Sequence, residues 1–119
     1  ELRHITNDHT YARQLMSEGR LSPERARLHP SAHMLVNSMG ARQRPQPEIG
    51  GIDDPCRDDS FLLCSDGLWA YFDPEELGEI IVSNSCRQAA TVLIDGARQR
   101  AGGRGDNCSL VLMRLDPEA

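Results

Sequence analysis

The sequence of 119 residues contains no lysine, so all 13 of its basic residues are arginine. The 18 acidic residues outnumber them and leave a formal net charge of −5 at pH 7. A protein that binds nucleic acid or another polyanion needs a basic surface, so this balance argues against that class. The exclusive use of arginine indicates the coding bias of a GC-rich genome and not a function.

Long hydrophobic runs and paired cysteines are also missing. No apolar run approaches the roughly 18 residues of a membrane-spanning helix, and no signal peptide pattern opens the sequence. The cysteines form no CxxC pair of the kind that a zinc ribbon uses. We therefore predict a cytoplasmic protein with reduced cysteines and no membrane partner. The four cysteines are Cys56, Cys64, Cys86 and Cys108.

The length allows one domain, and the first half of the sequence predicts short elements around a long loop. Thr10 can cap a helix that Gly19 would end, and Ser22 with Pro23 can begin a second. Further expected elements are a strand end at 1–6, a helix from His29 to Gly40 with Met34, Leu35 and Met39 on one side, and a short strand near 49–52.

The second half of the sequence predicts two buried strands and two helices. The apolar runs at 60–64 and 108–115 are typical of buried strands. Capping boxes that begin at Asp73 and Ser85 predict a helix through Val82 and a longer helix ended by Gly102. Since a stable sheet usually needs about three strands, we expect the chain to be an incomplete part of a larger domain.

Two aspartates lie where the predicted strands meet solvent. Asp66 directly follows the first strand and Asp106 precedes the second. Divalent cations such as Mg²⁺ or Mn²⁺ prefer such oxygen ligands, and a glycine beside each aspartate would let the backbone bend close to an ion. Asp and Gly are also among the commonest turn residues, so two ordinary turns are the alternative.

Longer strings around these aspartates resemble the metal-dependent type 2C (PPM) protein serine/threonine phosphatases of the bacterial type. Residues 59–69, DSFLLCSDGLW, are similar to the family segment GD-x-LLLCSDGL, and residues 105–112, GDNCSLVL, to its segment that begins with DN. The opening LRHITNDHT at 2–10 is similar to LT-x-DHS, and 19–40 follow the spacing G-x-I-T-x-E-E-A…HP…L…LG. The four pieces occur in the family's order.

The resemblance implies an α+β fold, a sandwich of two antiparallel β-sheets flanked by α-helices. It also implies that Asp66 and Asp106 are ligands of a dinuclear Mg²⁺ or Mn²⁺ centre. In the family, a hydroxide that bridges the ions attacks phosphoserine or phosphothreonine. The implied partners are phosphorylated proteins, substrates of a serine/threonine kinase in signalling.

Two departures from the family pattern matter. The family usually has an acidic residue four positions after the first aspartate, and Ala70 here puts a further, weaker metal site in doubt. The N-terminal half of the family's domain, with other metal ligands, has no counterpart in this sequence. We therefore expect residues 1–119 to be the C-terminal part of one phosphatase domain, with a flap-like segment at about 20–44, inactive alone and able to self-associate.

Other features have structural interpretations. His29 and His33 lack a third metal ligand nearby, and we expect Asp8 and His9 to support the fold. We expect Trp69 to pack in the core. Two alternatives to the enzyme stay open, a non-catalytic pseudophosphatase or regulatory binding module and, from the tripeptide at 104–106, an extracellular adhesion module. The acidic residues Asp53, Asp54, Asp58 and Asp59 predict a solvated turn.

Overall fold

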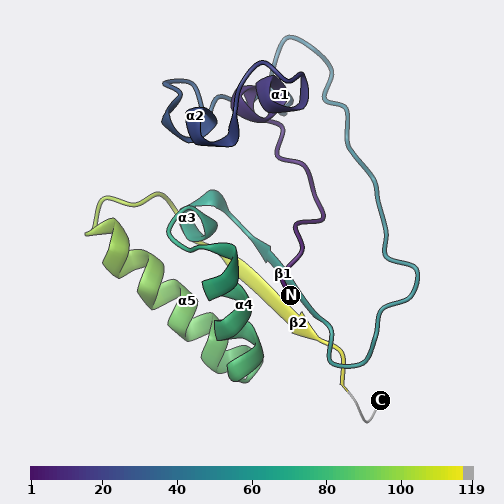
Figure 1. Cartoon of the computed structure of the whole chain (residues 1–119), viewed down its shortest axis with the longest axis vertical. Helices are drawn as coiled ribbons and strands as arrows, with labels where there is room; N and C mark the ends of the chain where they lie inside the picture. Colours follow the sequence, from purple (N-terminus) through teal and green to yellow (C-terminus); the bar gives the residue numbers. More distant parts are fainter. Residues whose placement is uncertain (117–119) are drawn as a thin grey trace. The chain divides into compact units, whose positions relative to one another are not determined.

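The computed structural model describes residues 1–116, apart from the side chain of Arg27. The chain forms two compact units (Figure 1). We call His4–Gly51 the loop unit, and Glu1–Arg3 together with the chain from Ile52 onward the sheet unit. The loop unit holds α1 (Tyr11–Ser17) and α2 (Pro23–Leu28). The sheet unit holds β1 (Ser60–Cys64), α3 (Asp66–Trp69), α4 (Pro74–Ser83), α5 (Cys86–Ala101) and β2 (Leu110–Arg114).

The sheet consists of β1 and β2, which pair antiparallel from Ser60↔Arg114 to Cys64↔Leu110. Successive side chains of a strand point to opposite faces, and both strands carry apolar residues on both faces. On one face they pack against the helices. On the other, Leu63 is 66% exposed and Val111, its partner across the ladder, is 64% exposed. The predicted α+β class is confirmed, with one antiparallel pair of strands among the described residues.

The core of the sheet unit lies between the sheet and helices α3, α4 and α5. Leu68 and Leu93 are fully buried there and are joined by other apolar side chains from α4, α5 and the segment between α3 and α4. Burying an aliphatic side chain of this size stabilises a fold by about 1.5–3 kcal/mol. The other members of this cluster are Phe72, Leu77, Ile81 and Ala97, with Leu62, Cys64, Leu110 and Leu112 of the sheet packed against it.

The ends of α4 and α5 show which local signals the fold uses. Ser85 accepts a hydrogen bond from the Gln88 N–H and donates its own N–H to the Gln88 side chain, so the predicted capping box is formed. Gly102 ends α5 in the left-handed conformation, at φ 60°. At α4, Pro74 occupies the first turn as expected, but the Asp73 side chain makes no capping hydrogen bond, so that box is not formed.

Two arginines tie the elements of the sheet unit together. Arg114 of β2 donates to the Ser60 hydroxyl (3.0 Å) and to the carbonyl oxygens of Asn84 (3.1 Å) and Ile81, where α4 ends. Arg100 of α5 pairs with Glu76 of α4. This hydrogen-bonded pair lowers the pKa of Glu76 and raises that of Arg100.

Few of the described side chains of the loop unit are buried, namely Ala12, Leu15 and Ala26. Hydrogen bonds from polar side chains hold the segment around Gln46 and Glu48 in place. Asn37 accepts from the Gln46 N–H (2.9 Å), donates to the Gln46 carbonyl oxygen and meets Nδ1 of His9 at 3.0 Å. The other ring nitrogen of His9 lies 3.3 Å from the Glu48 carboxylate. His9 therefore has the structural role expected of it.

Three expected elements in the first half are wrong. No helix follows Pro30, because backbone groups needed for it bond elsewhere: the Met34 carbonyl accepts from Tyr11 N–H, and the Val36 N–H donates to the His9 carbonyl. The strands at 1–6 and 49–52 are also absent from the described chain, since no strand there offers them a ladder. No helix in residues 1–116 has the length and apolar character of a membrane span.

Candidate functional site

The register of the sheet brings the two candidate aspartates to one end of it. Asp66 is the first residue of α3, two positions after β1 ends, and Asp106 lies four positions before β2 begins. Because the end of β1 at Cys64 pairs with the start of β2 at Leu110, both turns lie at that end. The Ser65 N–H donates to the Ser109 carbonyl oxygen over 3.0 Å and continues the ladder into the turns.

The glycines beside the aspartates are required by the packing of the protein itself. Gly67 is buried, and a side chain on it would overlap the carbonyl group of Asn107 and lie 3.2 Å from the carbonyl oxygen of Asp106. At Gly105, a side chain would lie 2.6 Å from the Ala101 methyl carbon. The role expected of these glycines, to let the backbone bend close to an ion, stays a prediction.

The two carboxylates are open to solvent. Asp66 and Asp106 are both exposed, and Asp106 accepts a hydrogen bond from the Asn107 N–H over 2.7 Å. Among the side chains that the structure describes, no arginine or histidine forms an ion pair with either of them. Two unneutralised carboxylates on adjacent turns fit the oxygen donor set of Mg²⁺ or Mn²⁺, which is commonly bound by one or two carboxylates and several waters.

The described residues alone do not complete a metal site. No group of three or more histidine, cysteine, aspartate or glutamate side chains is placed to hold an ion within that part of the chain. The role of Asp66 and Asp106 as ligands therefore stays a prediction, and further ligands would have to come from outside this set.

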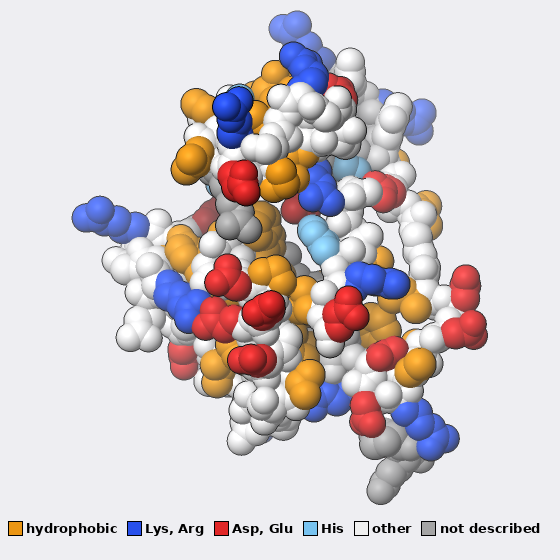
Figure 2. Space-filling model, viewed as in Figure 1, with side chains coloured by type: hydrophobic (Ala, Val, Ile, Leu, Met, Phe, Trp, Pro, Cys, Tyr) orange, Lys and Arg blue, Asp and Glu red, His pale blue; other side chains and the backbone are white. Residues whose placement is uncertain are grey.

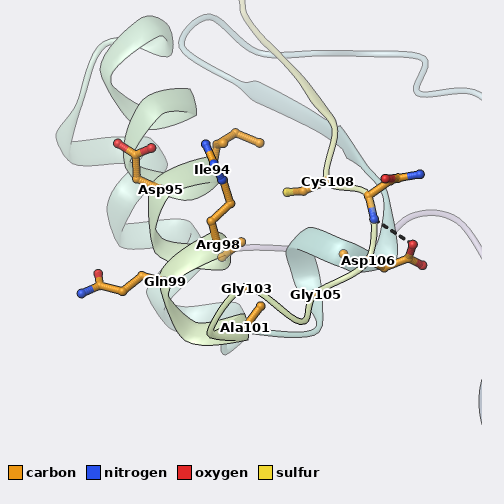
Figure 3. A pocket seen from close by; sticks show the side chains of 12 residues that line it. Ile94, Asp95, Arg98, Gln99, Ala101, Gly103, Gly105, Asp106 and Cys108 are labelled. Atoms are coloured by element: carbon orange, nitrogen blue, oxygen red, sulfur yellow. Dashed lines mark hydrogen bonds between the residues drawn. The ribbon is translucent and has the colours of Figure 1, made fainter.

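A hollow of about 730 Å³ lies between α5 and the segment that leads into β2. Arg98 and Ile94 line it from the helix, and Cys108 lines it from the opposite side with its sulfur pointing toward the helix (Figure 3). The Asp106 carboxylate points away from α5 (Figure 3). Gly67 and Asp106 also line the hollow, so it borders the two turns that carry the candidate ligands.

Other residues singled out in the sequence have structural roles or none. His29 accepts a hydrogen bond from the Ser31 N–H over 3.1 Å, and its ring packs edge-on against the Tyr11 ring with 5.7 Å between the ring centres. These contacts agree with a structural histidine. Trp69 is 41% exposed, so its expected core position is wrong, and Leu68 takes that place. None of the four cysteines, all within the described residues, forms a disulfide. The four aspartates of the acidic cluster are exposed, as expected for a solvated turn: Asp53, Asp54, Asp58 and Asp59.

Comparison with known proteins finds serine/threonine phosphatases. The chain is 30% identical over 118 residues to the protein phosphatase PhpP of Streptococcus pneumoniae, with 99% of the chain and 47% of PhpP covered. It is 31% identical over 112 residues to the serine/threonine protein phosphatase PstP of Mycobacterium tuberculosis, with 94% of the chain and 21% of PstP covered. No protein-family model matches the chain.

Solved structures give the same result. The M. tuberculosis phosphatase PstP/Ppp superposes with a TM-score of 0.79 at 29% identity, over 98% of this chain and 48% of that one. The PPM Ser-Thr phosphatase MsPP of Mycobacterium smegmatis, solved in complex with cacodylate, gives 0.77 at 31% identity, over 93% and 47%. The chain thus spans half or less of the length of the proteins it matches. By sequence and by fold, it is similar to about half of a bacterial serine/threonine phosphatase domain, including one solved structure of the PPM type.

Proposed function

We propose that this chain supplies part of a metal-dependent protein phosphatase that hydrolyses phosphoserine and phosphothreonine in proteins. The observation that carries the proposal is the pair of exposed, unpaired carboxylates, Asp66 and Asp106, on two turns that touch at one end of the sheet. One relative is named a protein phosphatase and another a serine/threonine protein phosphatase, and the substrates of this protein would be proteins phosphorylated by a serine/threonine kinase. A cytoplasmic location stays a prediction.

Asp66 and Asp106 would each hold Mg²⁺ or Mn²⁺ through a carboxylate oxygen. Bound divalent ions generate a nucleophile near neutral pH and offset negative charge on a phosphoryl group. The chain's own contribution is to hold two carboxylates at fixed positions and to leave them unneutralised. The related M. smegmatis phosphatase was solved in complex with cacodylate, which is a tetrahedral oxyanion, as is phosphate.

The proposed enzyme needs more than these 119 residues. Each ion takes about six oxygen ligands, and two carboxylates cannot supply them for two ions. The relatives are longer than this chain, and we propose that the remaining part of such a domain supplies the other ligands. Ala70, an exposed residue just after α3, leaves a further metal site without its usual carboxylate.

The proposal is tested in the intact protein that contains this chain. Asp66→Asn and Asp106→Asn are nearly isosteric and lie at exposed positions, so both should fold. Each removes a charge that would hold an ion, and Mn²⁺-dependent cleavage of a phosphothreonine peptide should fall by orders of magnitude. Asp95→Asn is the matched control, because Asp95 is exposed on α5 and its removal changes the net charge equally.

Two results would contradict this assignment. If both variants kept near wild-type turnover at low millimolar Mn²⁺, the aspartates would be ordinary turn residues. If the intact wild-type protein bound phosphorylated proteins without turnover, it would be a regulatory pseudophosphatase.

The uncovered face of the sheet predicts how the isolated chain behaves. Leu63 and Val111 expose apolar surface on it, and hydrophobic side chains are also visible on the surface in Figure 2. Such exposed strands favour association. The chain 1–119 alone should form oligomers in sedimentation experiments, and Val111→Lys should reduce their fraction. The control Val82→Lys places the same charge on α4, away from the sheet, and a monomeric wild-type chain would overturn the prediction.

A further inference from the structure

The hydroxyl of Ser65 joins the two turns that carry the aspartates. It donates to the carbonyl oxygen of Asn107 over 3.2 Å and accepts from the backbone N–H of Ser109 over 3.1 Å. Ser65 directly precedes Asp66, whereas Asn107 and Ser109 follow Asp106 by one and three residues. One side chain therefore connects segments that are 42 and 44 residues apart in the sequence.

This use of the hydroxyl is unusual for the residue's position. Ser65 precedes α3 with an extended backbone, φ −76° and ψ 164°, where a serine hydroxyl ordinarily accepts from an N–H of the first helical turn. It makes no such bond here, and the Leu68 N–H instead donates to the Ser65 carbonyl oxygen over 3.0 Å. The hydroxyl thus serves the contact between the turns and not the start of the helix.

The two turns are in close contact. The backbone of Gly67 lies so close to Asn107 that no side chain fits between them, and the Ser65 N–H also bonds to the Ser109 carbonyl. To bond to both Asn107 and Ser109, the side chain at position 65 must be short and must donate one hydrogen bond while it accepts another. Only serine and threonine offer such a hydroxyl, since alanine lacks one and a thiol forms weak hydrogen bonds.

We propose that Ser65 is a positioning residue that fixes the separation of Asp66 and Asp106 and thereby sets the affinity of this site for a divalent cation. The inference rests on the proposed function, because it takes these aspartates as ligands. Without the hydroxyl the two turns can move apart, and the carboxylates are no longer held in place before the ion binds. Groups that orient metal ligands in this way typically contribute about 10–100-fold in metal affinity.

The test uses the intact protein with Mn²⁺ as the probe and isothermal titration calorimetry as the readout. Ser65→Ala should weaken Mn²⁺ binding about tenfold or more, whereas Ser65→Thr, which keeps the hydroxyl, should bind close to the wild-type value. Ser109→Ala is the control. Ser109 is exposed and bonds to Ser65 through its backbone, so losing its hydroxyl should leave Mn²⁺ binding unchanged.

Thermal unfolding in EDTA separates positioning from a merely structural role. If Ser65→Ala lowered the melting temperature of the metal-free protein but the folded variant bound Mn²⁺ as the wild type does, the proposal would be overturned. It would also be overturned if Ser65→Thr bound as weakly as Ser65→Ala. Should Ser65→Ala fail to fold, Ser65→Cys replaces it, and the same loss of affinity is expected.

Failure of the proposed function gives a different result. In that case the wild-type protein itself would bind no Mn²⁺, or Asp66→Asn and Asp106→Asn would bind it normally, and both proposals would fall. Loss of binding in the aspartate variants with normal binding in Ser65→Ala would overturn only the role of Ser65.

Discussion

Different interactions stabilise the sheet unit and the loop unit internally. The sheet unit has a packed apolar core in which Leu68 and Leu93 are fully buried. Among its described side chains, the loop unit buries three, two of them alanines, and it depends on hydrogen bonds among His9, Asn37 and Glu48. Hydrophobic burial is roughly proportional to area and forgiving of detail, whereas each polar contact requires particular atoms at particular distances. The candidate site belongs to the unit with the larger core.

The largest effect is expected from Leu93→Ala in the core of the sheet unit. The substitution removes a fully buried side chain and leaves a cavity, so the free energy of unfolding should fall by about 2–5 kcal/mol. The matched control is Val92→Ala on the same helix, because Val92 is 45% exposed and should cost much less. Urea unfolding of the intact protein measures both. Equal losses for the two variants would show that this cluster is not the core.

A smaller and local effect is expected from Asn37→Ala in the loop unit. The variant loses two hydrogen bonds to the Gln46 backbone and one to His9, each with a net contribution of about 0.5–1.5 kcal/mol. The Gln46 amide should exchange faster with solvent, while amides of β1 and β2 keep their protection. Gln43→Ala, at an exposed position of the same segment, is the control. Unchanged exchange at Gln46 would contradict the importance of these contacts.

The two units also differ in how well sequence patterns predict their structure. Helix α5 and strands β1 and β2 follow from hydrophobic spacing, and Ser85 and Gly102 mark helix ends correctly, because these signals are local. The helix expected after Pro30 fails because backbone groups of that segment bond to residues near α1. A pattern within one segment contains no information about such distant partners.

Some features of the candidate site could be predicted from the sequence, and others could not. Asp66 and Asp106 are found from their turns and from the family resemblance, and the pairing of the strands places them at one end of the sheet. The sequence does not reveal the bonds of the Ser65 hydroxyl, because its partners are backbone groups that any residue could provide. Helix α3 was missed because four residues are too few for a helical period.

The smallest effect concerns the ion pair between Glu76 and Arg100. The hydrogen bond from Arg100 lowers the pKa of Glu76, so the pair stabilises the sheet unit above pH 4.5, the ordinary pKa of the carboxyl, and this contribution is lost as the pH falls through the lowered value. Glu76→Gln should therefore reduce the dependence of the melting temperature on pH in the acidic range. Glu79→Gln, exposed on the same helix, should retain the wild-type pH dependence. If the melting temperatures of wild type and Glu76→Gln depended on pH identically, the ion pair would not contribute to stability.

The central claim is that Asp66 and Asp106 act together as ligands of a divalent cation, and a crystal structure of the intact protein grown with Mn²⁺ tests it most directly. Anomalous scattering from Mn²⁺ should give peaks at a distance of about 2.1 Å from a carboxylate oxygen of each aspartate, since small divalent ions bind oxygen at about that distance. Further carboxylates from outside these 119 residues should complete the coordination. Anomalous peaks elsewhere, with both carboxylates bound only to water, would contradict the claim.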